Sequence, residues 1–252
     1  MASIVRTTWV RQSRFVVIVA LGALGALGGL AGAAHAQPTG VVTGTVSFEG
    51  EPPERVVQRR DTDPYCAKGD ARSEDVIVTG GKLKDVLVRI KNGALPGKPA
   101  VPAAPVLIDQ QDCRYTPRVV GLVAGQRLAV KNSDATFHNV HGAIAGQMLW
   151  NKPAAPNDPE IALDASARPG EVIDVVCDVH PWMHAYVVVQ DHAAFTVTGE
   201  DGAFTLKGLP PGTYTLEAWH PTLGLKSTRV TVGKAPNARA KAQFSFKRSD
   251  LK

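Results

Sequence analysis

The chain of 252 residues carries 28 Lys and Arg against 23 Asp and Glu, a formal net charge of +5. Its length allows one large or two small domains. Apart from Lys247-Arg248, the basic residues do not gather with aromatic residues, which excludes nucleic acid as an expected partner. The 24 Gly and 18 Pro, without helical periodicity beyond a couple of turns after residue 36, predict an all-β fold.

The N-terminal segment has the parts of a secretory signal peptide. Three arginines precede an apolar run that starts at Phe15, and Ala34-His35-Ala36 closes it. A membrane anchor is the alternative, because the run is long enough to span a bilayer, but its glycines and small final residues favour cleavage after Ala36. We therefore expect residues 1–36 to be a signal peptide. The mature protein is then periplasmic or secreted, without stable membrane insertion.

Alternating segments bounded by turn residues predict the next elements. Strands are expected at Val41–Phe48, before Gly50, and at Val86–Ile90, before Asn92-Gly93. The four prolines of Gly93–Pro105 indicate a connector, because proline donates no hydrogen bond to a β-ladder. We assign residues 37–103 to an N-terminal β segment and linker.

The block from 104 to 190 contains most of the chemistry. A strand is expected at Arg127–Val130, and a long loop at Asn151–Glu160, which contains three prolines. Its densest signal is Cys177-Asp-Val-His180-Pro-Trp-Met183, directly after an apolar strand. Soft sulfur ligands with imidazole favour copper, and a His₂Cys set with a weak axial Met is the electron-transfer arrangement.

The second imidazole has two candidates, His138 and His141, in the segment His-Asn-Val-His. They fall on opposite faces of an extended chain, so only one of them can reach the same ion. The order of the motif favours His138.

These two motifs resemble the cupredoxins, in particular amicyanin and other plastocyanin-like blue copper proteins. The ligand loop of that family also reads Cys-x-x-His-Pro-x-Met, and its upstream ligand also lies in His-Asn-Val-His. The resemblance spans roughly Val106–Val189 and implies a Greek-key β-sandwich over residues 104–190. It implies one type 1 copper per chain, with Asn139 restraining the Cys177 loop. The ligands that it implies are His138, Cys177, His180 and Met183.

The resemblance also implies that the His180 ring reaches the surface through an apolar patch and passes electrons there. Two alternatives to the ligand set stay open. Zinc accepts thiolate and imidazole, although a structural zinc site prefers a further Cys, His or carboxylate to Met. His184, which departs from the amicyanin pattern, could replace or supplement Met183 as axial ligand.

Two further cysteines, Cys66 and Cys113, remain. In an oxidising compartment they are natural disulfide partners, although spacing alone cannot establish the bridge. The alternative, a metal cluster of all three cysteines, has no recognisable ligand spacing.

The C-terminal stretch of residues 200–220, EDGAFTLKGLPPGTYTLEAWH, resembles the carboxypeptidase regulatory-like family of prealbumin-like, carbohydrate-binding-like domains. This implies a small β-sandwich over residues 191–252. The family usually begins with Gly-x-Val-x-Gly-x-Val, and the only comparable stretch is Gly40–Val46. We therefore hypothesise that the N-terminal segment completes the C-terminal sandwich and that the copper block is an insertion.

The expected function is that of an exported one-electron carrier between periplasmic redox partners. The resemblance implies a transient partner such as a cytochrome c or an exported dehydrogenase, and a link to methylamine utilisation. We do not expect an enzyme, because no second cluster of histidines is present. One alternative is copper binding for delivery. The other is a non-redox scaffold with a carbohydrate-binding-like domain, in which Trp219 and His220 stack on a ligand.

Overall fold

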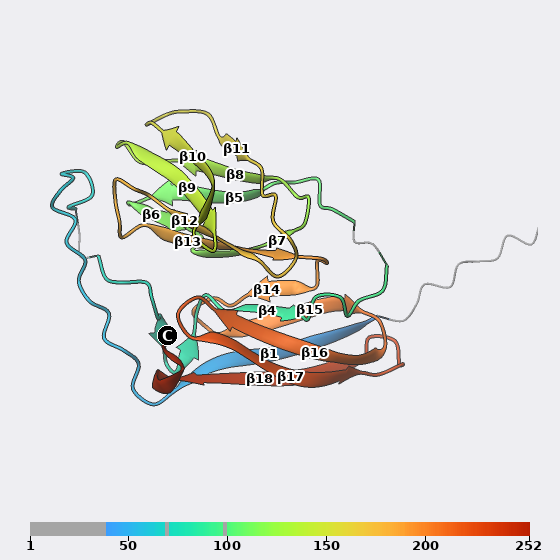
Figure 1. Ribbon diagram of the computed structural model, residues 1–252. Coiled ribbons are helices and arrows are strands. Elements are labelled where there is room, and N and C mark those ends of the chain that lie inside the picture. Colours follow the sequence, from blue (N-terminus) through green and yellow to red (C-terminus); the bar gives the residue numbers. More distant parts are fainter. Residues whose placement is uncertain (1–38, 69–70, 98–99) are drawn as a thin grey trace, which may run out of the picture. The chain divides into compact units, whose positions relative to one another are not determined.

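The computed structural model describes residues 39–68, 71–97 and 100–252. The signal peptide predicted at residues 1–36 lies outside this part of the chain. The described residues form two β-sandwiches (Figure 1), which confirms the all-β prediction. Their only helical element is a 3₁₀ turn at Arg248–Asp250. Within these ranges no helix has the length and apolar character needed to cross a membrane.

The first sandwich consists of two sheets from residues 106 to 190. Its strands are β5 (Val106–Gln111), β6 (Arg114–Thr116), β7 (Val119–Val123), β8 (Leu128–Asn132), β9 (His138–Ile144), β10 (Gln147–Ala154), β11 (Ile161–Leu163), β12 (Val172–Val176) and β13 (His184–Gln190). One sheet has the order β10-β9-β12-β13-β7, and the other has the order β11-β8-β5-β6. The pairs β5/β8 and β7/β13 are parallel, and the other pairs are antiparallel.

The second sandwich draws its strands from both ends of the chain. They are β1 (Gly40–Glu49), β2 (Val78–Thr79), β3 (Lys82–Leu83), β4 (Leu87–Ile90), β14 (Phe195–Val197), β15 (Ala203–Leu209), β16 (Gly212–His220), β17 (Gly224–Val232) and β18 (Arg239–Lys247). One sheet has the order β15-β1-β3-β2, with β18 also paired to β1, and the other has the order β14-β4-β16-β17.

The pairing of β1 bears on the insertion hypothesis. β1 pairs antiparallel with β15 and parallel with β18, and β4 pairs with β14 and β16. The chain therefore leaves the second sandwich after β4, builds the first sandwich, and returns at β14. Gly44 shows how closely β1 meets its neighbour, since a Cβ at this position would lie only 1.8 Å from the Ala242 carbonyl oxygen.

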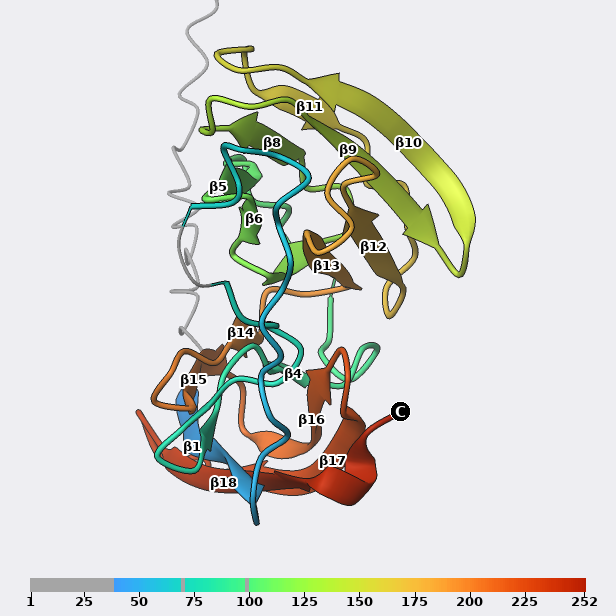
Figure 2. The same ribbon diagram turned by 90° about the vertical axis from the view of Figure 1, so that its left-hand side faces the viewer.

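The segment between β1 and β2 packs on the first sandwich, which the sequence analysis did not anticipate. We call its residues 60–66 the strap. The strap meets the turn between β5 and β6, where Nη1 of Arg60 donates to the Asp112 carbonyl oxygen at 2.8 Å. Cys66 and Cys113 form a disulfide with an S–S distance of 1.98 Å. Figure 2 shows this part of the chain running past β5 and β6.

The loop predicted at Asn151–Glu160 begins later than expected. β10 continues to Ala154, and Pro153 pairs with Asn139 of β9. β10 is the edge strand of its sheet, so a proline there removes no hydrogen bond that another strand needs. The prediction was therefore wrong for residues 151–154.

A buried histidine of the second sandwich makes its stability depend on pH. His220 is only 1% exposed, and burial lowers its pKa to about 3, whereas an unfolded histidine has a pKa of about 6.5. Between these values the unfolded chain binds a proton that the folded protein excludes. The stability contributed by neutral His220 is thus present above about pH 6.5 and is lost as the pH falls.

We expect His220→Gln to flatten this dependence. Between about pH 7 and about pH 4, the free energy of unfolding should fall in both proteins, but the fall should be smaller in the variant. The difference between the two decreases should be on the order of 3 kcal/mol. Urea unfolding curves at a series of pH values measure both slopes. Equal slopes in the two proteins would contradict the assignment.

Candidate metal centre

Three side chains bring their donor atoms together in the first sandwich. Nδ1 of His138 lies 2.9 Å from Nδ1 of His180, and Sγ of Cys177 lies 3.9 and 3.8 Å from these nitrogens. The point equidistant from the three atoms is about 2.1 Å from each, within the usual range of about 2.0–2.3 Å for metal bonds to imidazole and thiolate. All three side chains are buried. The site therefore fits a single metal ion.

The local structure explains how Cys177 and His180 meet. Along β12, Ile173 and Val175 face the core, and the same alternation carries Cys177 to that side. The chain then turns tightly. The N–H of Met183 donates to the His180 carbonyl at 2.9 Å, and the N–H of Cys177 donates to the Met183 carbonyl at 3.3 Å. These bonds fold the ligand loop back toward Cys177.

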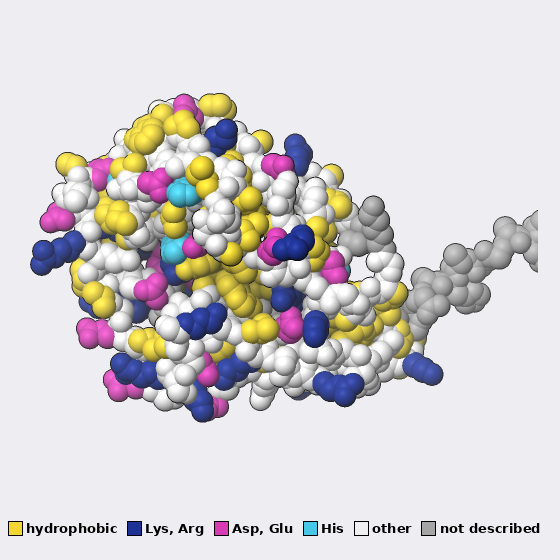
Figure 3. All heavy atoms as spheres, viewed as in Figure 1, with side chains coloured by type: hydrophobic (Ala, Val, Ile, Leu, Met, Phe, Trp, Pro, Cys, Tyr) yellow, Lys and Arg dark blue, Asp and Glu magenta, His cyan; other side chains and the backbone are white. Residues whose placement is uncertain are grey.

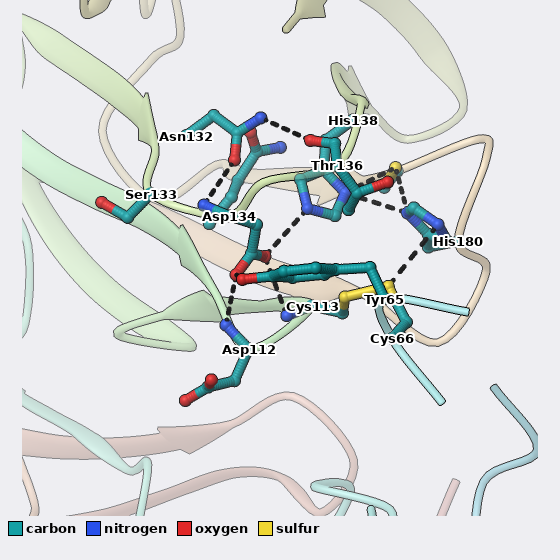
Figure 4. Close-up of polar contacts among 12 residues, drawn as sticks. Tyr65, Cys66, Asp112, Cys113, Asn132, Ser133, Asp134, Thr136, His138 and His180 are labelled. Atoms are coloured by element: carbon teal, nitrogen blue, oxygen red, sulfur yellow. Dashed lines mark hydrogen bonds and ion pairs between the residues drawn. A yellow bond between two sulfur atoms is a disulfide. The ribbon is translucent and has the colours of Figure 1, made fainter. Parts of the chain in front are cut away.

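His138, the first residue of β9, is oriented by a carboxylate. Its Nε2 lies 2.9 Å from Oδ2 of Asp134. Asp134 is fixed in turn by the backbone N–H groups of Asp112 and Cys113, at 2.8 and 2.9 Å, as Figure 4 shows. The contact leaves Nδ1 of His138 to face Cys177.

A second carboxylate, from the strap, orients His180. Nε2 of His180 lies 3.0 Å from Oδ2 of Asp63, and the Thr136 hydroxyl donates to the same oxygen at 2.7 Å. Carboxylates behind metal-binding imidazoles commonly fix the tautomer and the ring orientation. Both rings of this site have such a partner.

The electrostatics of the site favour the thiolate form of Cys177. Burial alone would raise the pKa of the Cys177 thiol, but hydrogen bonds from His138 and from backbone N–H groups outweigh it and lower the pKa. Burial opposes the charge on His138, yet Asp134 and Cys177 raise its pKa to about 9. Burial lowers the pKa of His180. The same contacts therefore favour the thiolate of Cys177 and the charged form of His138, whereas burial favours the neutral form of His180.

Asn139 ties the Cys177 loop to the sheet. Its Oδ1 accepts from the Asp178 N–H at 2.7 Å, and its Nδ2 donates to an Asp178 carboxylate oxygen at 2.7 Å. Its carbonyl oxygen accepts from the Tyr115 hydroxyl at 2.8 Å. The same hydroxyl lies 3.1 Å from the Val176 carbonyl oxygen and so links β9 to the end of β12.

The prediction that the His180 ring reaches the surface through an apolar patch is wrong. His180 is only 1% exposed, because the strap covers its Nε2 edge. Besides Asp63, Sγ of Cys66 lies 3.7 Å from Nε2, and the Trp182 ring lies 5.1 Å from the imidazole ring. Figure 4 shows the disulfide and Tyr65 of the strap beside the two histidines.

The remaining sequence candidates lie as follows. Met183 is fully buried in the same core cluster as Cys177. His141 points the other way along β9, and its Nδ1 lies 2.9 Å from an Asp178 carboxylate oxygen. His184 contacts Asp174 through Nε2 and stacks on Tyr186 with a centroid distance of 4.8 Å. The donor clusters of the described residues include neither of these two histidines.

Two functional residues escaped the sequence analysis. Asp134 lies four residues before His138, so an acidic residue at this distance from a candidate ligand was a usable, if weak, signal. Asp63 lies 117 residues before His180 in a segment without strand pattern. No local signal connects these two positions.

A comparison with known families gives a match in the later part of the chain. Residues 170–245 match the model of the carboxypeptidase regulatory-like domain. The match begins at β12 and β13 of the first sandwich and does not reach β1 or β4. The strands β1 to β4 of the second sandwich lie outside the matched residues. The predicted resemblance of the C-terminal stretch is confirmed.

Several solved structures are similar to parts of the chain. A purple cupredoxin from Nitrosopumilus maritimus is 21% identical over 34% of this chain and 99% of its own, with a TM-score of 0.30. An oxidised amicyanin variant is 22% identical over 41% and 98%, with a TM-score of 0.30. A copper-containing nitrite reductase from Thermus scotoductus is 17% identical over 38% and 24%, with a TM-score of 0.31. No curated protein matches the chain. The case for a metal centre rests on the side chains described above.

Proposed function

We propose that the chain is an exported type 1 copper protein that carries single electrons between periplasmic redox partners. The observation that carries the proposal is the convergence of Nδ1 of His138, Sγ of Cys177 and Nδ1 of His180 within 3.9 Å of one another. One thiolate and two imidazoles form the trigonal donor set of electron-transfer copper sites. Met183, buried beside Cys177, is the proposed axial ligand.

The residues fit copper better than the other metals considered. Among the described residues, no fourth Cys, His or carboxylate joins the three donors in the same cluster, as a structural zinc site would require. The lowered pKa of Cys177 favours the thiolate form that copper would bind. Copper bound by such a set supplies one-electron exchange between Cu(I) and Cu(II).

The protein contributes rigidity to this exchange. Asp134 and Asp63 hold the two imidazoles from behind, and the Asn139 contacts hold the Cys177 loop. Ligands fixed in this way need little rearrangement when the charge at the site changes. Outer partners of this kind typically contribute about 10–100-fold to metal affinity or activity.

The burial of the three donors supports electron carriage over copper delivery. All three donors are at most 1% exposed, and the strap lies over His180. A delivery protein must release its ion readily to a partner, whereas a carrier must keep it. The covered site favours retention.

Two further histidines, His192 and His220, make hydrogen bonds away from the proposed centre, which fits a carrier with a single copper. Nε2 of His192 lies 2.9 Å from the Ile90 carbonyl oxygen, and Nδ1 of His220 accepts from the Thr222 N–H at 3.2 Å. Both serve the second sandwich. Within the described residues, no histidine cluster for a second copper accompanies the centre.

The proposed partner is another exported redox protein, of the cytochrome c or dehydrogenase type, that docks briefly. Figure 3 shows basic and acidic side chains interspersed on the face in view. A surface of this kind suits a small and short-lived interface, below about 1,200 Å² in redox encounters. Because the strap covers His180, we place the docking surface on the strap and not on a bare imidazole edge. The disulfide suits the oxidising compartment that this proposal requires.

Visible and electron paramagnetic resonance spectra of the Cu(II) protein test the proposal. We expect an intense thiolate-to-copper absorption band with narrow copper hyperfine splitting, and rapid reversible reduction by one electron. Stoichiometric copper without this band, or Cu(I) that exchanges readily with a competing chelator, would point to delivery instead.

The axial ligand is tested by two neighbouring substitutions. Because His184 is engaged with Asp174 and Tyr186, His184→Ala should leave the spectra of the Cu(II) protein unchanged. Met183→Ala should shift the absorption band and the reduction potential, since the axial ligand tunes both. The reverse pattern would assign the axial position to His184.

A further inference from the structure

A cavity of about 190 Å³ lies between the strap and the turn that joins β5 to β6. Its wall includes the disulfide of Cys66 and Cys113 and three cationic side chains, those of Arg60, Lys68 and Arg114. Water occupies about 30 Å³ per molecule in the liquid, so a cavity of this size has room for a phosphate-sized ion.

Arg60 is the unusual member of this wall. The residue is 94% buried, since only 6% of its surface is exposed. Its Nη1 donates to the backbone carbonyl of Asp112, but its Nε and Nη2 have no hydrogen-bond partner in the part of the chain that the structure describes. No described carboxylate forms an ion pair with it. A buried charge without such a partner is costly.

The two partnerless atoms share one edge of the guanidinium group. This edge presents parallel N–H groups whose spacing matches two oxygens of a phosphate, sulfate or carboxylate. Cζ of Arg60 lies over the Trp182 ring, 5.7 Å from its centroid. This contact offsets part of the cost of burial but satisfies neither donor.

The remaining charges around the cavity are mainly positive. Nζ of Lys68 lies 4.7 Å from the centre of the Tyr65 ring and makes no ion pair with a described residue. Nε of Arg114 lies 4.0 Å from a Glu74 carboxylate oxygen but makes no hydrogen bond within the described residues. The Asp112 carboxylate is the acidic group of the wall. The carboxylates of Glu74, Asp112 and Asp134 also act on Arg60. The attraction of the cavity for an anion therefore rests on the two N–H groups of Arg60 that have no partner among the described residues, more than on an excess of positive charge.

We propose that this cavity binds a small oxyanion, with two of its oxygens held by Nε and Nη2 of Arg60 and its charge balanced by Lys68 and Arg114. Both Arg60 atoms are out of contact with solvent, so binding requires the guanidinium group to turn its free edge toward the cavity that its side chain lines. The ion would join the strap, through Arg60, and the neighbouring Lys68 to β6, through Arg114. It would thereby help to keep the strap closed over His180.

Inorganic phosphate is the probe for this site. The indole N–H of Trp182 donates to the Cys113 carbonyl at 3.1 Å, so its NMR signal reports on the adjoining cavity wall. Titration of the metal-free, disulfide-bonded protein at constant ionic strength should shift this signal saturably. Arg60→Gln should weaken phosphate binding about tenfold or more, because a charge-assisted bidentate contact is lost.

Arg59→Gln is the matched control, since it removes the same charge from an exposed neighbour and should leave the affinity unchanged. Arg60→Lys keeps the charge without the paired donors and should bind with intermediate affinity. If Arg60→Gln does not fold, a rise in the melting temperature of the wild-type protein with phosphate provides a second readout. Competition by acetate would include carboxylates among the ligands, and its failure would restrict the site to tetrahedral oxyanions.

Two results would overturn the proposal. If phosphate causes neither a saturable shift nor a rise in melting temperature, water alone satisfies the two donors. If Arg60→Gln binds as tightly as Arg59→Gln, the anion is drawn by general surface charge. Neither result depends on copper, so the site and the proposed electron carrier fail or stand separately.

Discussion

Cys177→Ser should abolish the intense visible band and the narrow hyperfine splitting of the Cu(II) protein. The band arises from electron transfer between a thiolate and the metal, and a serine hydroxyl neither ionises at neutral pH nor provides a soft donor. The lowered pKa of Cys177 favours its thiolate form, and no other free cysteine exists among the described residues. The absorption and electron paramagnetic resonance spectra measure the effect.

His141→Ala is the matched control for the histidine that precedes the loop. It removes an imidazole three residues from His138 on the other face of β9, where it contacts Asp178 and not Cys177. His141→Ala should keep the intense visible band of the Cu(II) protein, whereas His138→Ala should lose it. A band that survives in Cys177→Ser, with circular dichroism showing a folded protein, would exclude the thiolate as a ligand.

Removing the disulfide, by Cys66→Ser together with Cys113→Ser, should destabilise the protein and open the metal centre. The bridge closes a loop with a sequence separation of 47, for which the entropic model gives about 4 kcal/mol of stabilisation. It also anchors the strap, whose Asp63 contacts His180. Copper should therefore be extracted by a chelator faster from the double variant than from the wild-type protein.

Tyr65→Phe is the control for this experiment, because it weakens the contacts of the strap without removing its disulfide. It removes only the 3.3 Å hydrogen bond to Asp134 and leaves the disulfide in place. This variant should lower the free energy of unfolding by about 1 kcal/mol, which is the typical net contribution of a single hydrogen bond. If the double cysteine variant unfolds and releases copper no faster than Tyr65→Phe, the strap is not what closes the site.

The sequence was most informative where chemistry and local pattern coincide. Strand alternation runs through Val175 to Cys177, and a three-residue spacing leads on to His180, so local geometry alone brings these two ligands close. The repeated turns of the C-terminal stretch likewise predicted a small sandwich, because each turn residue limits the backbone locally. Both features depend on neighbours within a few residues.

What the sequence could not supply depends on contacts between distant segments. The burial of His180 follows from Asp63 and Cys66, which lie more than a hundred residues earlier in a stretch without strand pattern. Likewise, the cavity beside Arg60 exists only because the disulfide brings that stretch to the β5–β6 turn. Resemblance to proteins with an exposed ligand ring led to the opposite expectation for His180.

The pairing of β1 with the last strand has a consequence for how the chain folds. Val41–Glu49 of β1 pairs in parallel with Arg239–Lys247 of β18, and Ser47 donates to the Phe244 carbonyl across 197 positions. A chain that emerges from its N-terminus leaves β1 without this neighbour until β18 has appeared. Every strand of the first sandwich, by contrast, lies between residues 106 and 190. The ligand-bearing sandwich can thus assemble while its host is still incomplete, and closure of the host is the late, slow event expected of long-range pairing.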